Sequence, residues 1–125
     1  MPLQYRRDQP KRRFIVTLMG DVTIDDLASF VASQITMGLW PSSVLYDATA
    51  PGVTLQPLQT VPVDLWRELR AEHGARGPVA FVVADEQQRA IAAGYVNAVV
   101  AAGLFTAALF TDVAEAERWL DTQAG

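Results

Sequence analysis

The chain contains no cysteine, a single histidine (His73) and a single lysine (Lys11). Without cysteine it can form no disulfide, no thiolate nucleophile and no cysteine-ligated zinc site. A zinc site built on one histidine would need three carboxylates, which is not a preferred ligand set. His73 lies in the last turn of a predicted helix, before Gly74, where a histidine interacts with the exposed carbonyl groups of the helix end. We therefore expect no catalytic or metal site, no cofactor, and a protein that is not an enzyme.

Glycine-rich phosphate loops are also missing. The dinucleotide motif GxGxxG and the P-loop motif GxxxxGK[ST] do not occur, and the strand-to-helix turns read GDVT, DATAPG, ADEQ and TDVA. Asp47, at the end of the strand VLYD, resembles the acceptor of phospho-receiver domains, but Lys11 is far from the last strand, where those domains place a lysine. Asp25 and Asp26 fall in the first turn of a helix, where acidic groups are favoured anyway. We expect Asp47 to end its strand and to bind loop amides.

Positive charge is scarce outside the N-terminus. The net charge is −4, yet residues 1–13 carry Arg6, Arg7, Lys11, Arg12 and Arg13 against one acidic residue. The acidic remainder is a poor match for nucleic acid, because phosphate contacts dominate that affinity. We expect the basic residues 1–13 to form a solvated hairpin strand and turn, with contact to an anionic partner or a membrane surface as the alternative.

Residues 90–111, AIAAGYVNAVVAAGLFTAALFT, carry no charge and are long enough to span a membrane. They contain Gly94, Asn97 and Gly103, and the AAG is typical of a helix C-terminus. We expect a buried helix followed by a buried strand, and no membrane contact. No signal peptide is visible at the N-terminus, so a cytoplasmic location is the default expectation.

The hydrophobic pattern predicts one α/β domain over residues 1–125 with the order β-β-α-β-α-β-α-β-α. Turn-forming residues at 8–11 indicate an N-terminal hairpin, and strands follow at 43–47, 78–84 and 105–110. Helices are expected from Thr23 to Gly38, from Pro62 to Gly74, from Gln87 to Ala102 and from Asp112 onward. Such alternation predicts a four- to five-stranded mixed, mainly parallel sheet, with the first strand at an edge and about four helices.

Four segments together resemble the STAS-like superfamily. They are GDVTIDDLASFV, SSVLYDATA, GPVAFVVADEQQ and LFTAALFTDVAEAERWL, the last with the pattern FxxxxEAxxWL from Phe110 to Leu120. That superfamily includes the tail domains of sulfate transporters and the anti-sigma-factor antagonists, and the chain is most similar to its single-domain SpoIIAA-like branch. The resemblance covers nearly the whole chain. It implies a mixed sheet packed with helices and a role in protein–protein regulation.

In the antagonists, a serine in an Asp-Ser-Ser-Gly turn after the strand that corresponds to VLYDA is phosphorylated, which controls partner docking. That turn is absent here. The segment TAPGVTLQPLQTVP replaces it, with Thr49, Thr54 and Thr60 as its hydroxyl groups. Thr60 is closest to the next helix and is the candidate phosphorylation site, with a cap or loop role as the alternative.

Two functions follow from these observations. The first is a non-enzymatic regulatory module that acts through a protein partner or as a homodimer. It rests on the third helix, whose apolar residues occupy more than one stripe, either because the helix is buried on two sides or because another chain covers it. The candidate interface residues are Ile91, Tyr95, Val96, Val99 and Val100. The second function is the binding of an apolar or lipid-like small ligand, with Trp40, Trp66 and Tyr95 as candidate pocket residues that could equally be core.

Overall fold

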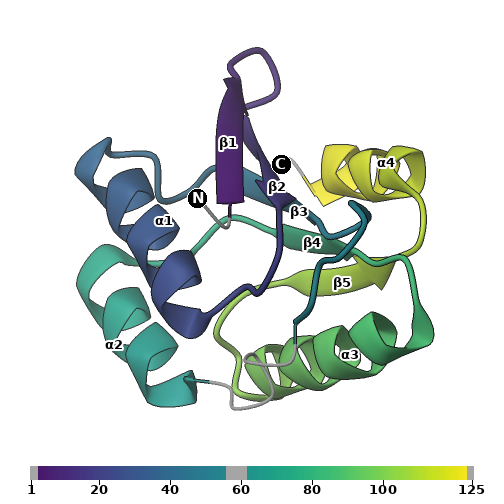
Figure 1. The fold of residues 1–125 in the computed structure, drawn as a ribbon. Coiled ribbons are helices and arrows are strands. Elements are labelled where there is room, and N and C mark those ends of the chain that lie inside the picture. The colour runs from purple at the N-terminus through teal and green to yellow at the C-terminus, as the bar shows by residue number, and fades with distance from the viewer. Residues whose placement is uncertain (1–2, 56–61, 124–125) are drawn as a thin grey trace.

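The computed structural model describes residues 3–55 and 62–123 (Figure 1). Nine helices and strands lie within these ranges. In chain order they are β1 (Leu3–Asp8), β2 (Arg13–Leu18), α1 (Ile24–Thr36), β3 (Ser43–Asp47), α2 (Val63–His73), β4 (Val79–Val82), α3 (Glu86–Ala101), β5 (Ala107–Phe110) and α4 (Val113–Gln123). The order predicted from the hydrophobic pattern is confirmed.

The strands form one five-stranded sheet in the order β1-β2-β3-β4-β5. β1 and β2 pair antiparallel around the turn at residues 9–12, and the three later pairs are parallel. The mixed, mainly parallel sheet and the edge position of the first strand are therefore both confirmed. Because each parallel strand is added on the same side of the one before it, right-handed crossovers place α1, α2 and α3 on one face of the sheet.

The sheet separates two cores of different size. The larger core lies under α1, α2 and α3, and the smaller one lies under α4 on the opposite face (Figure 1). Tyr46 and Phe81 face the larger core, while their strand neighbours Leu45 and Ala80 face the smaller one. This alternation follows the two-residue period of a strand, so β3 and β4 are apolar on both faces.

Local sequence signals mark where two helices begin and where one ends, as the pattern predicts. The Thr23 side chain accepts from the backbone N–H of Asp26, and the Asp26 carboxylate accepts from the backbone N–H of Thr23, which completes a capping box. Gly38 follows α1 with a positive φ of 70°. Asp85 accepts from the Gln88 backbone N–H at the start of α3. The caps expected at these three places are confirmed.

The two last parallel strands are shorter than predicted. β4 covers Val79–Val82 within the expected 78–84, and β5 covers Ala107–Phe110 within the expected 105–110. Val83, which follows β4, is buried, and Phe105, which lies ahead of β5, packs against the larger core, so both are apolar without being counted in the strands. The uncharged run at 90–111 is confirmed as a helix followed by a strand, but the strand is half-buried at every position and not buried as expected. Within residues 3–55 and 62–123, no helix has the length and apolar character needed to cross a membrane.

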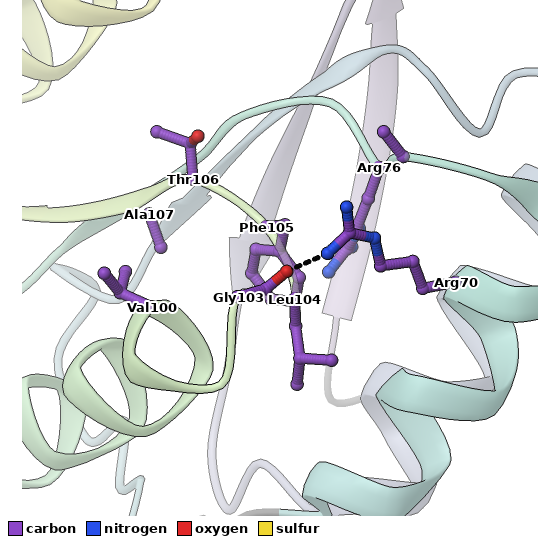
Figure 2. Close-up of a pocket in the computed structure, with 9 residues that line it drawn as sticks. Arg70, Arg76, Val100, Gly103, Leu104, Phe105, Thr106 and Ala107 are labelled. Atoms are coloured by element: carbon purple, nitrogen blue, oxygen red, sulfur yellow. Dashed lines mark hydrogen bonds between the residues drawn. The ribbon is translucent and has the colours of Figure 1, made fainter.

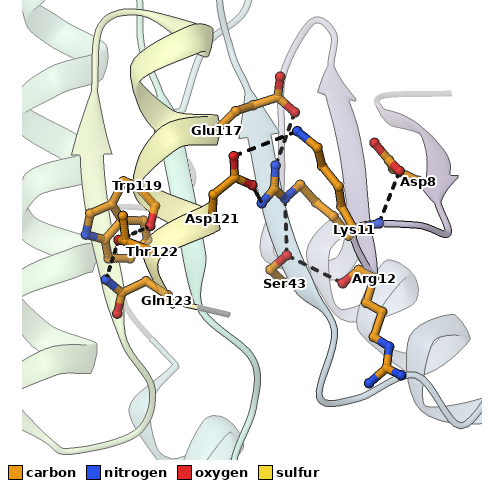
Figure 3. A network of polar contacts seen from close by, with 10 residues as sticks. Asp8, Lys11, Arg12, Ser43, Glu117, Trp119, Asp121, Thr122 and Gln123 are labelled. Carbon is orange, nitrogen blue, oxygen red and sulfur yellow. Dashed lines mark hydrogen bonds and ion pairs between the residues drawn. The ribbon is translucent and has the colours of Figure 1, made fainter. Parts of the chain in front are cut away.

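The solvated hairpin expected at residues 1–13 is wrong for Arg13, which is only 1% exposed. Its guanidinium donates to Glu117 at 3.3 Å and to Asp121 at 2.7 Å, and its Nε donates to Ser43 Oγ at 3.3 Å. Lys11 also lies 3.8 Å from Asp121 (Figure 3). The hairpin is thus joined to α4 by ion pairs. Sequence alone could not indicate this, because the carboxylates lie more than a hundred positions away.

Candidate functional site

Arg76 is a charged side chain in the larger core. It lies in the segment between α2 and β4 and is only 7% exposed. The next residue, Gly77, passes so close to the loop before β3 that a Cβ atom would lie 2.3 Å from the carbonyl oxygens of Pro41 and Ser42. The Gly77 N–H donates to the Trp40 carbonyl at 3.4 Å. This close approach fixes the course of the backbone that carries Arg76.

Aromatic rings surround the Arg76 guanidinium. Its central carbon lies 5.4 Å from the Trp40 ring centre, 5.3 Å from that of Trp66 and 4.9 Å from that of Phe105. Each such contact stabilises a cation by about 0.5–2 kcal/mol. One guanidinium nitrogen donates to the Tyr46 hydroxyl at 3.1 Å, and the Arg76 Nε has no partner among the described residues. The described contacts of this cation are thus all with neutral groups.

Tyr95 on α3 belongs to the same buried group. Burial raises the pKa of Tyr95 well above its ordinary value, and the neighbouring Tyr46 raises it further. Arg76 and the Trp66 indole lower the pKa of Tyr95 by less, and Trp66 Nε1 makes no hydrogen bond of normal geometry with any described residue. Tyr95 thus stays protonated near neutral pH and cannot act there as a base.

A cavity of about 390 Å³ adjoins this cluster at the amino ends of β4 and β5. Arg70, at the C-terminal end of α2, reaches across the cavity and donates to the Gly103 carbonyl oxygen (Figure 2). Gly103 follows α3 with a positive φ of 68°. The cavity is lined by two arginines and mainly small or apolar residues: Arg70, Ala75, Arg76, Val100, Gly103, Leu104, Phe105, Thr106 and Ala107.

The candidate pocket residues Trp40, Trp66 and Tyr95 are buried, at 5%, 3% and 3% exposed, and do not line this cavity. Trp40 Nε1 donates to the Gly74 carbonyl at 3.0 Å, which helps to end α2. Trp66 packs edge-on against Phe105. The core role that was the alternative for these aromatics is the one they have in this structure.

The candidate interface residues on α3 divide into two groups. Ile91, Tyr95 and Val99 follow one another at four-residue spacing and belong to the larger core of the monomer. Because α3 buries these three side chains against the sheet, they offer little surface to another chain. Val96 is partly buried, and Val100 is 50% exposed. Only Val100 of the five candidates offers substantial apolar surface to a partner.

The remaining candidates have structural positions. The Asp47 carboxylate accepts from the Thr49 backbone N–H at 2.9 Å and from the Thr49 hydroxyl at 2.6 Å, so the expected loop bonding is confirmed. His73 lies in the last turn of α2, where its Nε2 is 3.4 Å from a Glu72 carboxylate oxygen. Thr60 lies outside the described residues. In the described part of the chain, no group of three His, Cys, Asp or Glu side chains could hold a metal ion.

The two edges of the sheet differ in chemistry. β1 carries Arg6, Arg7 and Asp8, whereas β5 (AALF) and its flanking residues Thr106 and Thr111 carry no charge. Among the described strands, none pairs with the outer edge of β5. Natural edge strands are commonly protected by charge or proline, and β5 has neither.

Comparison with known proteins assigns this chain to no family. A scan against models of protein families found no match to this chain, and a search of curated proteins found no significant match.

Sequence reasoning missed Arg76 as a site residue. The available signal was an isolated arginine in GARGPVAFVV, directly before a fully apolar strand and beside a glycine. Its aromatic neighbours come from three separate segments, so only the fold brings them together.

Proposed function

We propose that this chain is a non-enzymatic, STAS-like regulatory module that acts by pairing with a second copy of itself through β5. The observation that carries the proposal is the uncharged outer edge of β5. Such an edge offers unpaired backbone donors and acceptors to another strand. The STAS-like assignment rests on the resemblance of the four sequence segments and is compatible with the sheet and helix order.

The surroundings of β5 also suit a protein contact. Val100 on α3 is 50% exposed and Val113 at the start of α4 is 36% exposed, and both helices contact β5. An antiparallel pair centred on Leu109 would set Ala107 of each copy opposite Thr111 of the other. No like charges would meet along this pair, although the chain as a whole carries a net charge of −4.

The test is the oligomeric state of the purified chain by native mass spectrometry and sedimentation. We expect a dimer for the wild type and a monomer for the double variant Thr106→Lys/Thr111→Lys, because lysines at both ends of each β5 would oppose strand pairing through their like charge. Both threonines are exposed, so the fold should persist. Mixing this variant with Thr106→Glu/Thr111→Glu should restore a dimer that contains one copy of each.

The matched control is Gln4→Lys, an exposed position on the opposite edge strand β1, which should leave the dimer intact. A wild-type monomer at all accessible concentrations would contradict self-pairing and leave a different protein as the partner. A dimer that persists in the lysine double variant would show that the contact lies elsewhere.

A further inference from the structure

The residues that line the 390 Å³ cavity at the amino ends of β4 and β5 include two arginines and no acidic residue. Arg70 is exposed, and its only described partner is the backbone carbonyl oxygen of Gly103. Arg76 is only 7% exposed, and its Nε has no hydrogen-bond partner among the residues that the structure describes. The wall is thus strongly cationic, although the chain as a whole is acidic.

Arg76 is unusual because its charge has no counter-charge within the described chain. The ion pairs there involve Lys11, Arg13, Arg67 and His73, and neither cavity arginine takes part in one. Buried charges in proteins are normally paired, because leaving water without a partner is costly. Aromatic faces and one tyrosine hydroxyl offset part of that cost for Arg76 but supply no negative charge.

Arg13 provides an internal comparison. It is as deeply buried as Arg76, yet two carboxylates of α4 bind it directly. The same fold therefore satisfies one buried arginine from its own sequence and leaves the other with neutral groups only. The open space beside the unsatisfied arginine is where an external anion would fit.

We propose that this cavity binds a small organic acid, whose carboxylate or phosphate group pairs with the guanidinium groups of Arg70 and Arg76. Planar guanidinium groups match both kinds of oxyanion, and Arg70 can exchange its neutral carbonyl partner for the stronger charged one. Val100, Leu104 and Phe105 supply an apolar wall for the rest of the ligand. The volume lies in the range typical of small-molecule sites. All these residues belong to one chain, so the proposal does not depend on self-pairing through β5.

The experiment is a titration of isotopically labelled protein followed by two-dimensional NMR. The Nε–H signal of Arg76 reports changes in the environment of its guanidinium group. Benzoate and phenyl phosphate are the anionic probes, and benzamide is the neutral probe of similar size. We expect saturable shifts with both anions at the Arg76 Nε–H and at the amides of 103–107, and none with benzamide. The anion that binds more tightly shows whether the head group of the ligand is a carboxylate or a phosphate.

Arg70→Met tests the pairing without removing a buried group, because Arg70 is exposed. It should weaken benzoate binding about tenfold or more, the usual effect of losing one charge-assisted hydrogen bond. Arg67→Met is the matched control on the same helix, since Arg67 pairs with Asp64 and does not line the cavity. It should leave the affinity unchanged.

Three results would overturn the proposal. They are the absence of saturable shifts with either anion, equal binding of benzamide, and wild-type affinity in Arg70→Met. Inorganic phosphate that binds as tightly as phenyl phosphate would overturn the assignment of an organic ligand, because the apolar wall would then contribute nothing.

Discussion

At Gly77 the backbone leaves no room for a side chain. A Cβ atom there would lie 2.3 Å from the carbonyl oxygens of Pro41 and Ser42, which are backbone atoms and cannot rotate away. We expect Gly77→Ala to lower the free energy of unfolding by about 1–3 kcal/mol or more, the usual cost of overpacking. Urea unfolding followed by tryptophan fluorescence measures this change.

Gly94 is the matched control. It lies on the exposed side of α3, and a Cβ atom there meets nothing within 4 Å. Gly94→Ala should raise the free energy of unfolding by about 0.5–1 kcal/mol, because alanine loses less conformational freedom in a helix. Equal effects of the two substitutions would contradict the close approach at Gly77.

The two buried arginines mark the limit of prediction at the scale of single residues. Arg13 precedes an apolar strand after a basic turn, and Arg76 precedes another after a glycine-containing loop, so both look like exposed strand ends in the sequence. Their burial depends on residues far along the chain: Glu117 and Asp121 for Arg13, and Tyr46 for Arg76. Local patterns carry no information about such partners.

At the scale of elements, α4 is joined to the hairpin by charge. The Arg13 guanidinium, through its hydrogen bond to Asp121, lowers the pKa of that carboxyl below its ordinary value, and Lys11 acts in the same direction. A carboxyl whose pKa is lower in the folded state stabilises the fold above its unfolded pKa. That stabilisation is lost as the pH falls through the folded pKa.

We therefore expect the difference in unfolding free energy between the wild type and Asp121→Asn to be constant at neutral pH and to shrink below about pH 4. Urea unfolding midpoints measured between neutral and acidic pH would show it. Asp64→Asn, which breaks the exposed pair with Arg67, is the control for the loss of an exposed ion pair. A difference between the wild type and Asp121→Asn that does not change with pH would contradict the role of Asp121.

Most elements could be predicted because their signals are local. The capping pair Thr23 and Asp26 starts α1, and the strand Ser43–Asp47 has the predicted bounds. The apolar residues of α3 were harder to interpret, because Ile91, Tyr95 and Val99 belong to one stripe while Val100 lies beside it on the surface. Periodicity shows that a helix is apolar, but it does not show which neighbour covers each side.

At the scale of the whole molecule, the two cores should differ in stability. The smaller core holds α4 through Ala116 and Leu120 against Leu45, Ala80 and Val82, whereas three helices enclose the larger one. Elements with fewer buried contacts open more easily. In native-state hydrogen exchange, we expect the amides of α4 to open at a lower free energy than those of β3 and β4.

Two leucine substitutions separate the cores. Leu120→Ala, at a fully buried position in the smaller core, should accelerate exchange in α4 first. Leu27→Ala, at an equally buried position in the larger core, should accelerate exchange in every element by lowering global stability. If both variants accelerate the same amides to the same extent, the two cores unfold as one unit.

The unlike edges of the sheet have a consequence for how far association can proceed. Once two copies join through β5, each end of the ten-stranded sheet is a β1 strand that carries Arg6, Arg7 and Asp8. Such ends disfavour pairing with further strands, and because both β5 edges are already paired, an open fibre would require β1 of one dimer to pair with β1 of another. The placement of charge on one edge alone therefore makes the proposed assembly stop at two copies.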